Sequence, residues 1–203
     1  MSGAQSYCTF RIQLNGMALT ESTHFPLNTS APDFTLLDTI SGELRALQSL
    51  KGDKGTVIFF ICNHCPFVLH INEQLVALAN DYLPLGIGFI AISSNSAESH
   101  PQDGPEFMKQ RAEELHYPFP YLYDATQEVA RAYAAVCTPD IYVFDEELHS
   151  VYHGQLDGSR PGNGVPVTGE DLRKALDALL NREDPIENQQ PSIGCNIKWH
   201  PFK

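Results

Sequence analysis

Two cysteines separated by two residues carry the clearest chemistry in this sequence. They belong to the segment Cys62-Asn63-His64-Cys65-Pro66, which follows an apolar run and precedes a helical pattern. A thiol attacks as its thiolate, and the unpaired N–H groups and positive dipole end of a helix N-terminus lower a cysteine pKa from about 8.5 to about 3.5–7.5. Two intervening residues allow the sulfurs to close a small disulfide ring. We therefore expect Cys62 to be the exposed attacking thiol and Cys65 to resolve the mixed disulfide.

His64 lies between the two thiols and is a candidate for tuning them. As an imidazolium it would favour the Cys62 thiolate, which stabilises the reduced form and makes the couple more oxidising. The alternative is an ordinary exposed histidine. We expect Asn63 to be a helix-cap or turn residue.

A C-x-x-C pair can instead hold zinc, which usually takes four ligands and often two such pairs. The chain has no second C-x-x-C. A set could be assembled from Cys62, Cys65, Cys137 and Cys195, or with His64, but no spacing singles it out. We therefore favour a redox disulfide. Its exchange reactions take place between sulfur atoms and require no metal and no cofactor.

The hydrophobic pattern around the cysteines predicts an α/β domain. Residues 56–61 and 87–92 are continuous apolar runs, which is typical of strands covered on both faces. Apolar residues between them recur at three- and four-residue spacing and predict a helix that ends at 84–86. Further strands are expected at 31–36, 43–47, 119–123, 141–144 and 148–153, and further helices from Pro105, over 126–135 and over 170–180.

These elements indicate one folded domain over residues 31–182. Residues 1–30 are expected to be an N-terminal extension, and residues 183–203 an irregular tail. Met17 could serve as an alternative start, and Cys8 before it is expected to be an inert thiol.

Composition limits the possible partners. The 203 residues, 42% of them hydrophobic, suit a single domain whose core is stable without disulfide staples. Asp and Glu total 25 against 13 Lys and Arg, and a net charge of −12 should repel nucleic acid and anionic lipid. The longest apolar run, Thr56 to Cys62, is far shorter than the roughly 20 residues of a membrane-spanning helix. We expect neither nucleic-acid binding nor membrane insertion.

Cysteine usage predicts a reducing compartment. A secreted disulfide framework is usually even-numbered and denser, whereas this chain has five cysteines. Residues 1–16 contain one basic residue, Arg11, and no apolar stretch of a secretory signal. We therefore expect a cytoplasmic location.

A second informative segment is Cys137-Thr138-Pro139-Asp140, directly before an apolar strand that ends at Asp145. A proline at the start of a strand can have a special role, and the Thr-Pro bond can be cis. The alternative is an ordinary trans proline that leads into the strand.

Together these segments resemble the thioredoxin superfamily, and in particular its redoxin branch, which includes membrane-tethered bacterial thiol reductases and peroxiredoxins. The resemblance covers about residues 31–181. It is carried by Ala31-Pro32-Asp33-Phe34, by the strand followed by Cys62 to Cys65, and by the helix followed by Thr138-Pro139. It implies a thioredoxin-like three-layer α/β/α sandwich with an N-terminal β-hairpin extension, and a cis Pro139 that packs opposite the cysteines and helps bind the partner chain.

The chain is also similar to a peroxiredoxin-like subgroup, through the Cys-Asn-His-Cys-Pro segment and through residues 191–199. Peroxiredoxins carry P-x-x-x-T-x-x-C, and alignment of its cysteine on Cys65 places Cys62 at the threonine and Ile58 at the proline. Pro139 stands where that family has its catalytic arginine, which stabilises charge in the transition state. A thiol-dependent peroxidase is therefore the alternative to disulfide exchange, and a non-catalytic redox sensor or zinc-holding adaptor is the third reading.

Three further residues have two interpretations each. Arg160 could supply a guanidinium, but we favour a solvated loop arginine. Cys195, near the only tryptophan, Trp199, either exchanges with Cys62 as a third redox thiol or simply packs on the domain. Cys137 is expected near the site as a buried spectator. The predicted activity is thiol–disulfide exchange with protein or small-molecule disulfides, supplied with electrons by a cellular thiol reductant.

Overall fold

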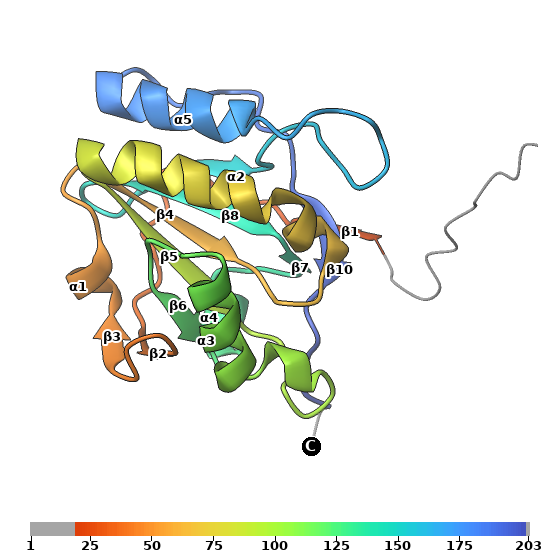
Figure 1. The fold of residues 1–203 in the computed structure, drawn as a ribbon. Coiled ribbons are helices and arrows are strands. Elements are labelled where there is room, and N and C mark those ends of the chain that lie inside the picture. Colours follow the sequence, from red (N-terminus) through yellow and green to blue (C-terminus); the bar gives the residue numbers. More distant parts are fainter. Residues whose placement is uncertain (1–18, 202–203) are drawn as a thin grey trace, which may run out of the picture.

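A computed structural model describes residues 19–201 (Figure 1). Its main sheet has the strand order β3-β2-β6-β5-β4-β8-β9. The central strands β4 and β5 are parallel, as are β5 and β6, whereas β8 runs antiparallel to β4. The bounds are β2 Thr35–Asp38, β3 Leu44–Ala46, β4 Gly55–Phe60, β5 Ile87–Ser93, β6 Tyr121–Tyr123, β8 Asp140–Asp145 and β9 Ser150–Gly154.

Helices cover both faces of this sheet and give three layers. The helices are α1 Leu47–Leu50, α2 Pro66–Tyr82, α3 Pro105–Glu114, α4 Glu128–Ala132 and α5 Glu170–Asn181. Figure 1 shows α2 and α5 side by side over one face, and buried side chains of α3 join the same core. Side chains of α1 and α4 belong to the core of the other face. The predicted thioredoxin-like α/β/α sandwich is confirmed.

Strand β4 shows why a continuous apolar run is required at the centre. Every residue of β4 is buried. Because successive side chains of a strand point to opposite faces, Val57 and Phe59 enter one core while Ile58 and Phe60 enter the other. A polar residue at any of these positions would be buried in one of the two layers.

Helix α2 begins and ends where the sequence predicts. Pro66 occupies its first position, where the missing N–H is not needed, and Cys65 is the N-cap. A short 3₁₀ turn, Leu83–Leu85, follows, and Gly86 ends it with a φ of +95°. Cys65 therefore lies at the N-terminus of α2, at the end of the short segment that connects β4 to the helix.

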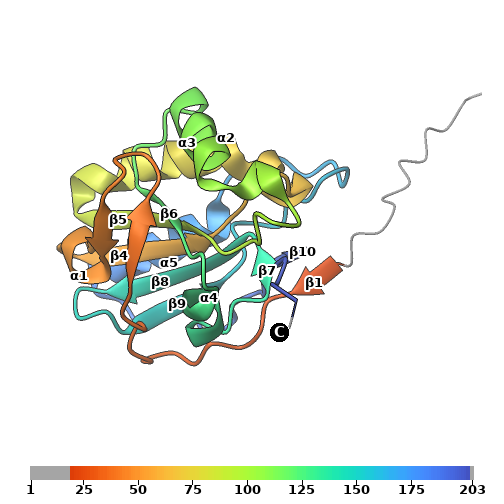
Figure 2. The same ribbon diagram turned by 90° about the horizontal axis from the view of Figure 1, so that it is seen from below.

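A second, three-stranded sheet was not predicted. It consists of β1 Leu19–Glu21, β10 Ile193–Asn196 and β7 Cys137–Thr138, in the order β1-β10-β7. Figure 2 shows these strands together at one end of the main sheet. The expectation of an irregular tail over 183–203 is wrong for residues 193–196. These strands are short and have no local pattern, so they depend on pairing with each other.

The remaining predicted elements need small corrections. The expected N-terminal hairpin exists as the antiparallel pair β2 and β3, but β2 begins at Thr35 and joins the main sheet through β6. After β3 the chain turns into α1, because Leu47 is fully buried in the core beneath it. Among residues 19–201, no helix is both long and apolar enough to span a bilayer. Cys8 and the alternative start at Met17 lie outside the described residues.

Gly52 lies very close to the backbone at the start of the central strands β4 and β5. A Cβ on Gly52 would lie 2.2 Å from the backbone nitrogen of Gly88 and 2.4 Å from the carbonyl oxygen of Gly55. We expect Gly52→Ala to destabilise the fold by about 1–3 kcal/mol, because the backbone must move apart. Denaturant unfolding measures this. Gly158→Ala is the control, because a Cβ there meets nothing within 4 Å; equal stability of the two variants would contradict the prediction.

Candidate active site

The two cysteines of the C-x-x-C lie between β4 and α2, and both are enclosed. Cys62 is 2% exposed and Cys65 is fully buried as the N-cap of α2. The expectation that Cys62 is an exposed thiol is therefore wrong. Both residues belong to the hydrophobic core under α2, together with Cys195.

Thr138 contacts both thiols. Its Oγ1 lies 3.5 Å from Cys62 Sγ, and its carbonyl oxygen lies 3.1 Å from Cys65 Sγ. The peptide bond that follows, between Thr138 and Pro139, is cis. The two informative segments of the sequence therefore meet. Pro139 also lines a shallow pocket beside them, together with Phe67 and Ile71 of α2 and with Arg160.

Cys195 comes to the same cluster from the far end of the chain. Its Sγ lies 2.9 Å from the Sγ of Cys65. Strand β10 pairs with β7 so that Cys195 is opposite Thr138. A Cβ on the neighbouring Gly194 would lie 2.0 Å from the Thr138 carbonyl oxygen. Only glycine lets the two strands approach this closely.

The pKa of Cys65 is lowered from the ordinary value of a cysteine thiol. The thiols of Cys195 and Cys62 and the backbone N–H groups of Val68 and Cys195 stabilise its negative form, so its pKa lies well below the ordinary value. Burial acts in the opposite direction, but the four donors outweigh it. The Thr138 carbonyl accepts a hydrogen bond from Cys65 Sγ when that thiol is protonated.

The pKa of Cys62 is shifted in the opposite direction. Its pKa is raised by its hydrogen bond to Cys65, then by burial, and then by the nearby carboxylate of Asp103. The expectation that Cys62 has the lowered pKa is therefore wrong: of the two cysteines, Cys65 has the lower pKa. The pKa of Cys195 is also raised, first by its hydrogen bond to Cys65.

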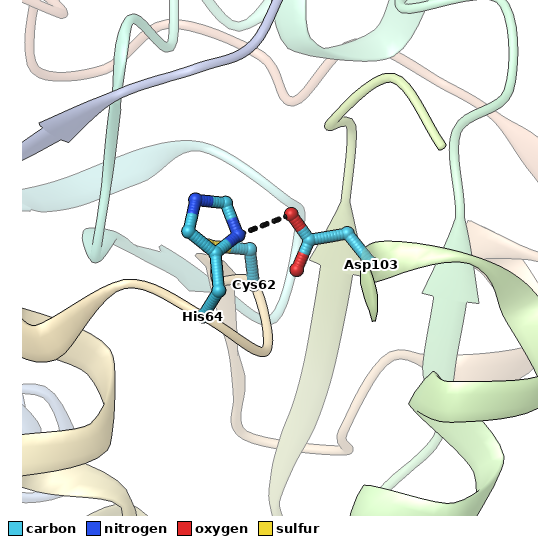
Figure 3. A group of neighbouring side chains, drawn as sticks. All are labelled: Cys62, His64 and Asp103. Carbon is cyan, nitrogen blue, oxygen red and sulfur yellow. Dashed lines mark hydrogen bonds and ion pairs between the residues drawn. The ribbon is translucent and has the colours of Figure 1, made fainter. Parts of the chain in front are cut away.

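His64 is held by a carboxylate that the sequence did not indicate. Its Nδ1 lies 2.6 Å from Asp103 Oδ2, and Figure 3 shows the two side chains pointing toward one another beside Cys62. Asp103 is fully buried and also accepts from the backbone N–H of Asn63 and the side chain of Asn95, each at 2.8 Å. His64 is 18% exposed and stacks on His100. Asp103 lies 39 residues away in a polar loop, so no local signal could have found it.

Cys62, His64 and Asp103 are also the one group in residues 19–201 whose ligand atoms lie close enough to share a metal ion, all within 4.8 Å. This set differs from the four-cysteine set considered from the sequence. The oxygens of Asp103 already accept from three donors. Asp103 is therefore better suited to orienting His64 and the backbone of Asn63 than to binding a metal ion.

Cys137 and Arg160 lie near the site without joining the thiols, and Trp199 packs against the core on the other face of the sheet. Cys137 is fully buried, its Sγ lies 3.7 Å from the Pro139 carbonyl, and burial raises its pKa. Arg160 is not a solvated loop residue: its guanidinium donates to the carbonyls of Asp157 and Ser159 and to the side chain of Gln155. Trp199 lies under the guanidinium of Arg131, 4.5 Å from the ring centroid.

Comparison with known proteins shows similarity to one protein family and to several solved structures. Residues 27–152 match the model of a family described as the AhpC/TSA family. No protein of curated function matches the chain.

Solved structures resemble the whole fold. An uncharacterized conserved protein from Geobacillus kaustophilus is 60% identical, with a TM-score of 0.91 over 93% of this chain and 100% of that one. A hypothetical protein from Sinorhizobium meliloti 1021 is 46% identical, with a TM-score of 0.88 over 90% of this chain and 100% of that one. The thioredoxin domain of a thiol-disulfide oxidoreductase from Bacteroides vulgatus shares the fold, at 20% identity and a TM-score of 0.61 over 78% of this chain and 100% of that domain.

The assignment of the charge to Cys65 can be measured. We expect the reduced protein to retain thiolate absorbance in the far ultraviolet from about pH 7 down to about pH 4, where a free thiol with a pKa near 8.5 is protonated. The lowered pKa keeps Cys65 ionised as the pH falls. Cys65→Ser should remove this absorbance, and Cys137→Ser should leave it unchanged. If the absorbance instead disappears in Cys62→Ser and persists in Cys65→Ser, the charge lies on the other sulfur.

Proposed function

The chain belongs to the AhpC/TSA family of thioredoxin-like redox proteins, and on that basis we propose that it is a thiol–disulfide oxidoreductase. It would exchange a Cys62–Cys65 disulfide with protein or small-molecule thiols. The observation that carries this proposal is the contact between the two thiols at the start of α2, where the pKa of Cys65 is lowered and that of Cys62 is raised.

The distribution of protons suggests the order of steps. Cys65 Sγ is enclosed by Thr138, Cys195 and the N-terminus of α2, so a substrate meets Cys62 first, beside the partly exposed His64. Cys62 attacks one sulfur of the substrate disulfide and gives its proton to Cys65. The departing substrate thiolate takes that proton, and Cys62 forms a mixed disulfide.

The second step closes the protein disulfide. The Cys65 thiolate attacks Cys62 Sγ, the bond to the substrate breaks, and the second substrate sulfur leaves as a thiolate. The dithiol has lost two electrons and the substrate disulfide has gained them. A cellular thiol reductant would restore the dithiol by the reverse exchange, so the cycle calls for no cofactor.

The contacts of Arg160 bear on the peroxidase alternative. Arg160 lines the same pocket as Pro139. Its Nη atoms donate to neighbouring oxygen atoms, whereas its buried Nε has no hydrogen-bond partner among residues 19–201. Its Nη groups are therefore engaged in holding its own loop. With Cys62 in place of the threonine of the peroxiredoxin motif, disulfide exchange fits the site better than peroxide reduction.

Trapping the mixed disulfide tests the proposal. We expect Cys65→Ser to accumulate one glutathione on Cys62 when the reduced protein meets glutathione disulfide, because the resolving sulfur is missing. Reduction of a protein disulfide such as insulin should fall by roughly 100-fold or more in both Cys62→Ser and Cys65→Ser, because each lacks a reacting sulfur. Mass spectrometry and a turbidity assay provide the two measurements.

Cys137→Ser is the matched control, since it removes a buried thiol that lies near the site without contacting the other sulfurs, and it should keep the wild-type rate. Unchanged rates in the Cys62 and Cys65 variants would refute the proposal. Faster oxidation of the dithiol by micromolar hydrogen peroxide than by glutathione disulfide would favour the peroxidase.

A further inference from the structure

We infer that Cys195 is a third redox thiol, and that the disulfide formed between Cys62 and Cys65 passes to a bridge between Cys65 and Cys195. This inference rests on the proposed function and concerns where the oxidised chain keeps its disulfide. Cys65 Sγ is in hydrogen-bond contact with both other sulfurs.

The sulfur geometry suits this transfer. Cys65 and Cys195 Sγ lie 2.9 Å apart, about 0.9 Å longer than a disulfide bond of about 2.05 Å. Thiol–disulfide exchange needs a central sulfur with the attacking sulfur on one side and the leaving sulfur on the other. Cys65 is that central sulfur, with Cys195 to attack and Cys62 to leave.

Backbone pairing along strand β10 holds Cys195 in this position. It is paired with β7 and with β1, and Leu19 lies opposite Cys195. Beyond the strand, Ile197 N–H donates to Val136 O, and Lys198 N–H donates to the side chain of Asn95. A thiol that merely filled space would not require the glycine at position 194, where a Cβ would strike Thr138.

Packing around Trp199 does not explain the position of Cys195 either. Cys195 belongs to the core under α2, whereas Trp199 packs against the core on the other face of the sheet. The two residues therefore contribute to different parts of the interior, and the sulfur contact is the feature specific to Cys195.

The transfer is balanced and needs no added oxidant. Cys195 gives up its proton and attacks Cys65 Sγ, so the Cys65–Cys195 bond forms while the Cys62–Cys65 bond breaks. Cys62 leaves as a thiolate and takes the proton. The chain still holds one disulfide, and Cys62 is again a thiol that can meet a second substrate.

Disulfide mapping of the full-length chain tests the inference. The reduced protein is oxidised with glutathione disulfide, quenched with acid, alkylated, and cleaved with trypsin without reduction. Cys62 and Cys65 fall in the peptide 55–109, and Cys195 falls in the peptide 183–198. We expect these two peptides to be linked in the wild type and in Cys137→Ser, and the link to form more slowly in Cys62→Ser, which lacks the sulfur that receives the substrate.

Two further variants separate the thiol from the strand that carries it. Cys195→Ser should hold its disulfide between Cys62 and Cys65 within peptide 55–109. Gly194→Ala keeps every thiol but pushes β10 away from Thr138, so the yield of linked peptides should fall at least several-fold, while Gly158→Ala should match the wild type.

The outcomes distinguish this inference from the function on which it rests. If the wild type keeps a Cys62–Cys65 disulfide and Cys195 is alkylated as fully as in the reduced protein, the inference is wrong and the proposed function stands. If neither disulfide forms and Cys65→Ser traps no glutathione, both are wrong.

Discussion

The contacts of Thr138 are the constraint on which the thiol cluster depends. Its hydroxyl faces Cys62, its carbonyl faces Cys65, and its backbone pairs with the strand that carries Cys195. One residue therefore contacts or pairs with the segments of three cysteines, and Cys65 and Cys195 among them are 130 residues apart. The second sheet holds Thr138 in place, because β7 is only two residues long and pairs with β10. Both ends of the described chain thus support the active-site segment.

Hydrogen-bond donors explain why Cys65 has a lower pKa than Cys62. A thiolate in the interior is costly unless several donors point at it. Cys65 has them, because the N-cap position supplies the N–H of Val68 and β10 supplies the N–H of Cys195. Cys62 lies closer to the Asp103 carboxylate, which disfavours a second negative charge. The same carboxylate orients His64, so the polar loop before α3 shapes the site as much as the C-x-x-C itself does.

The local signals in the sequence predicted most of the main fold. Strands β4 and β5 are continuous apolar runs, and α2 has helical spacing with proline at its first position, so each could be recognised from a short window. Strands β1, β7 and β10 could not. They have two to four residues each, and they exist because they pair with one another across the length of the chain. A strand of this kind has no hydrophobic period to detect.

The sequence by itself determined the chemistry and the architecture: two thiols at the start of a helix, after a buried strand, in an α/β fold. It also determined that a Thr-Pro segment precedes the antiparallel strand beside them. Only the tertiary structure decided which sulfur has the lower pKa, which carboxylate holds His64, and that Cys195 contacts Cys65. The reason is physical. Strand and helix patterns are set by neighbours in the chain, whereas a pKa and a sulfur contact are set by groups that only folding brings within a few ångströms.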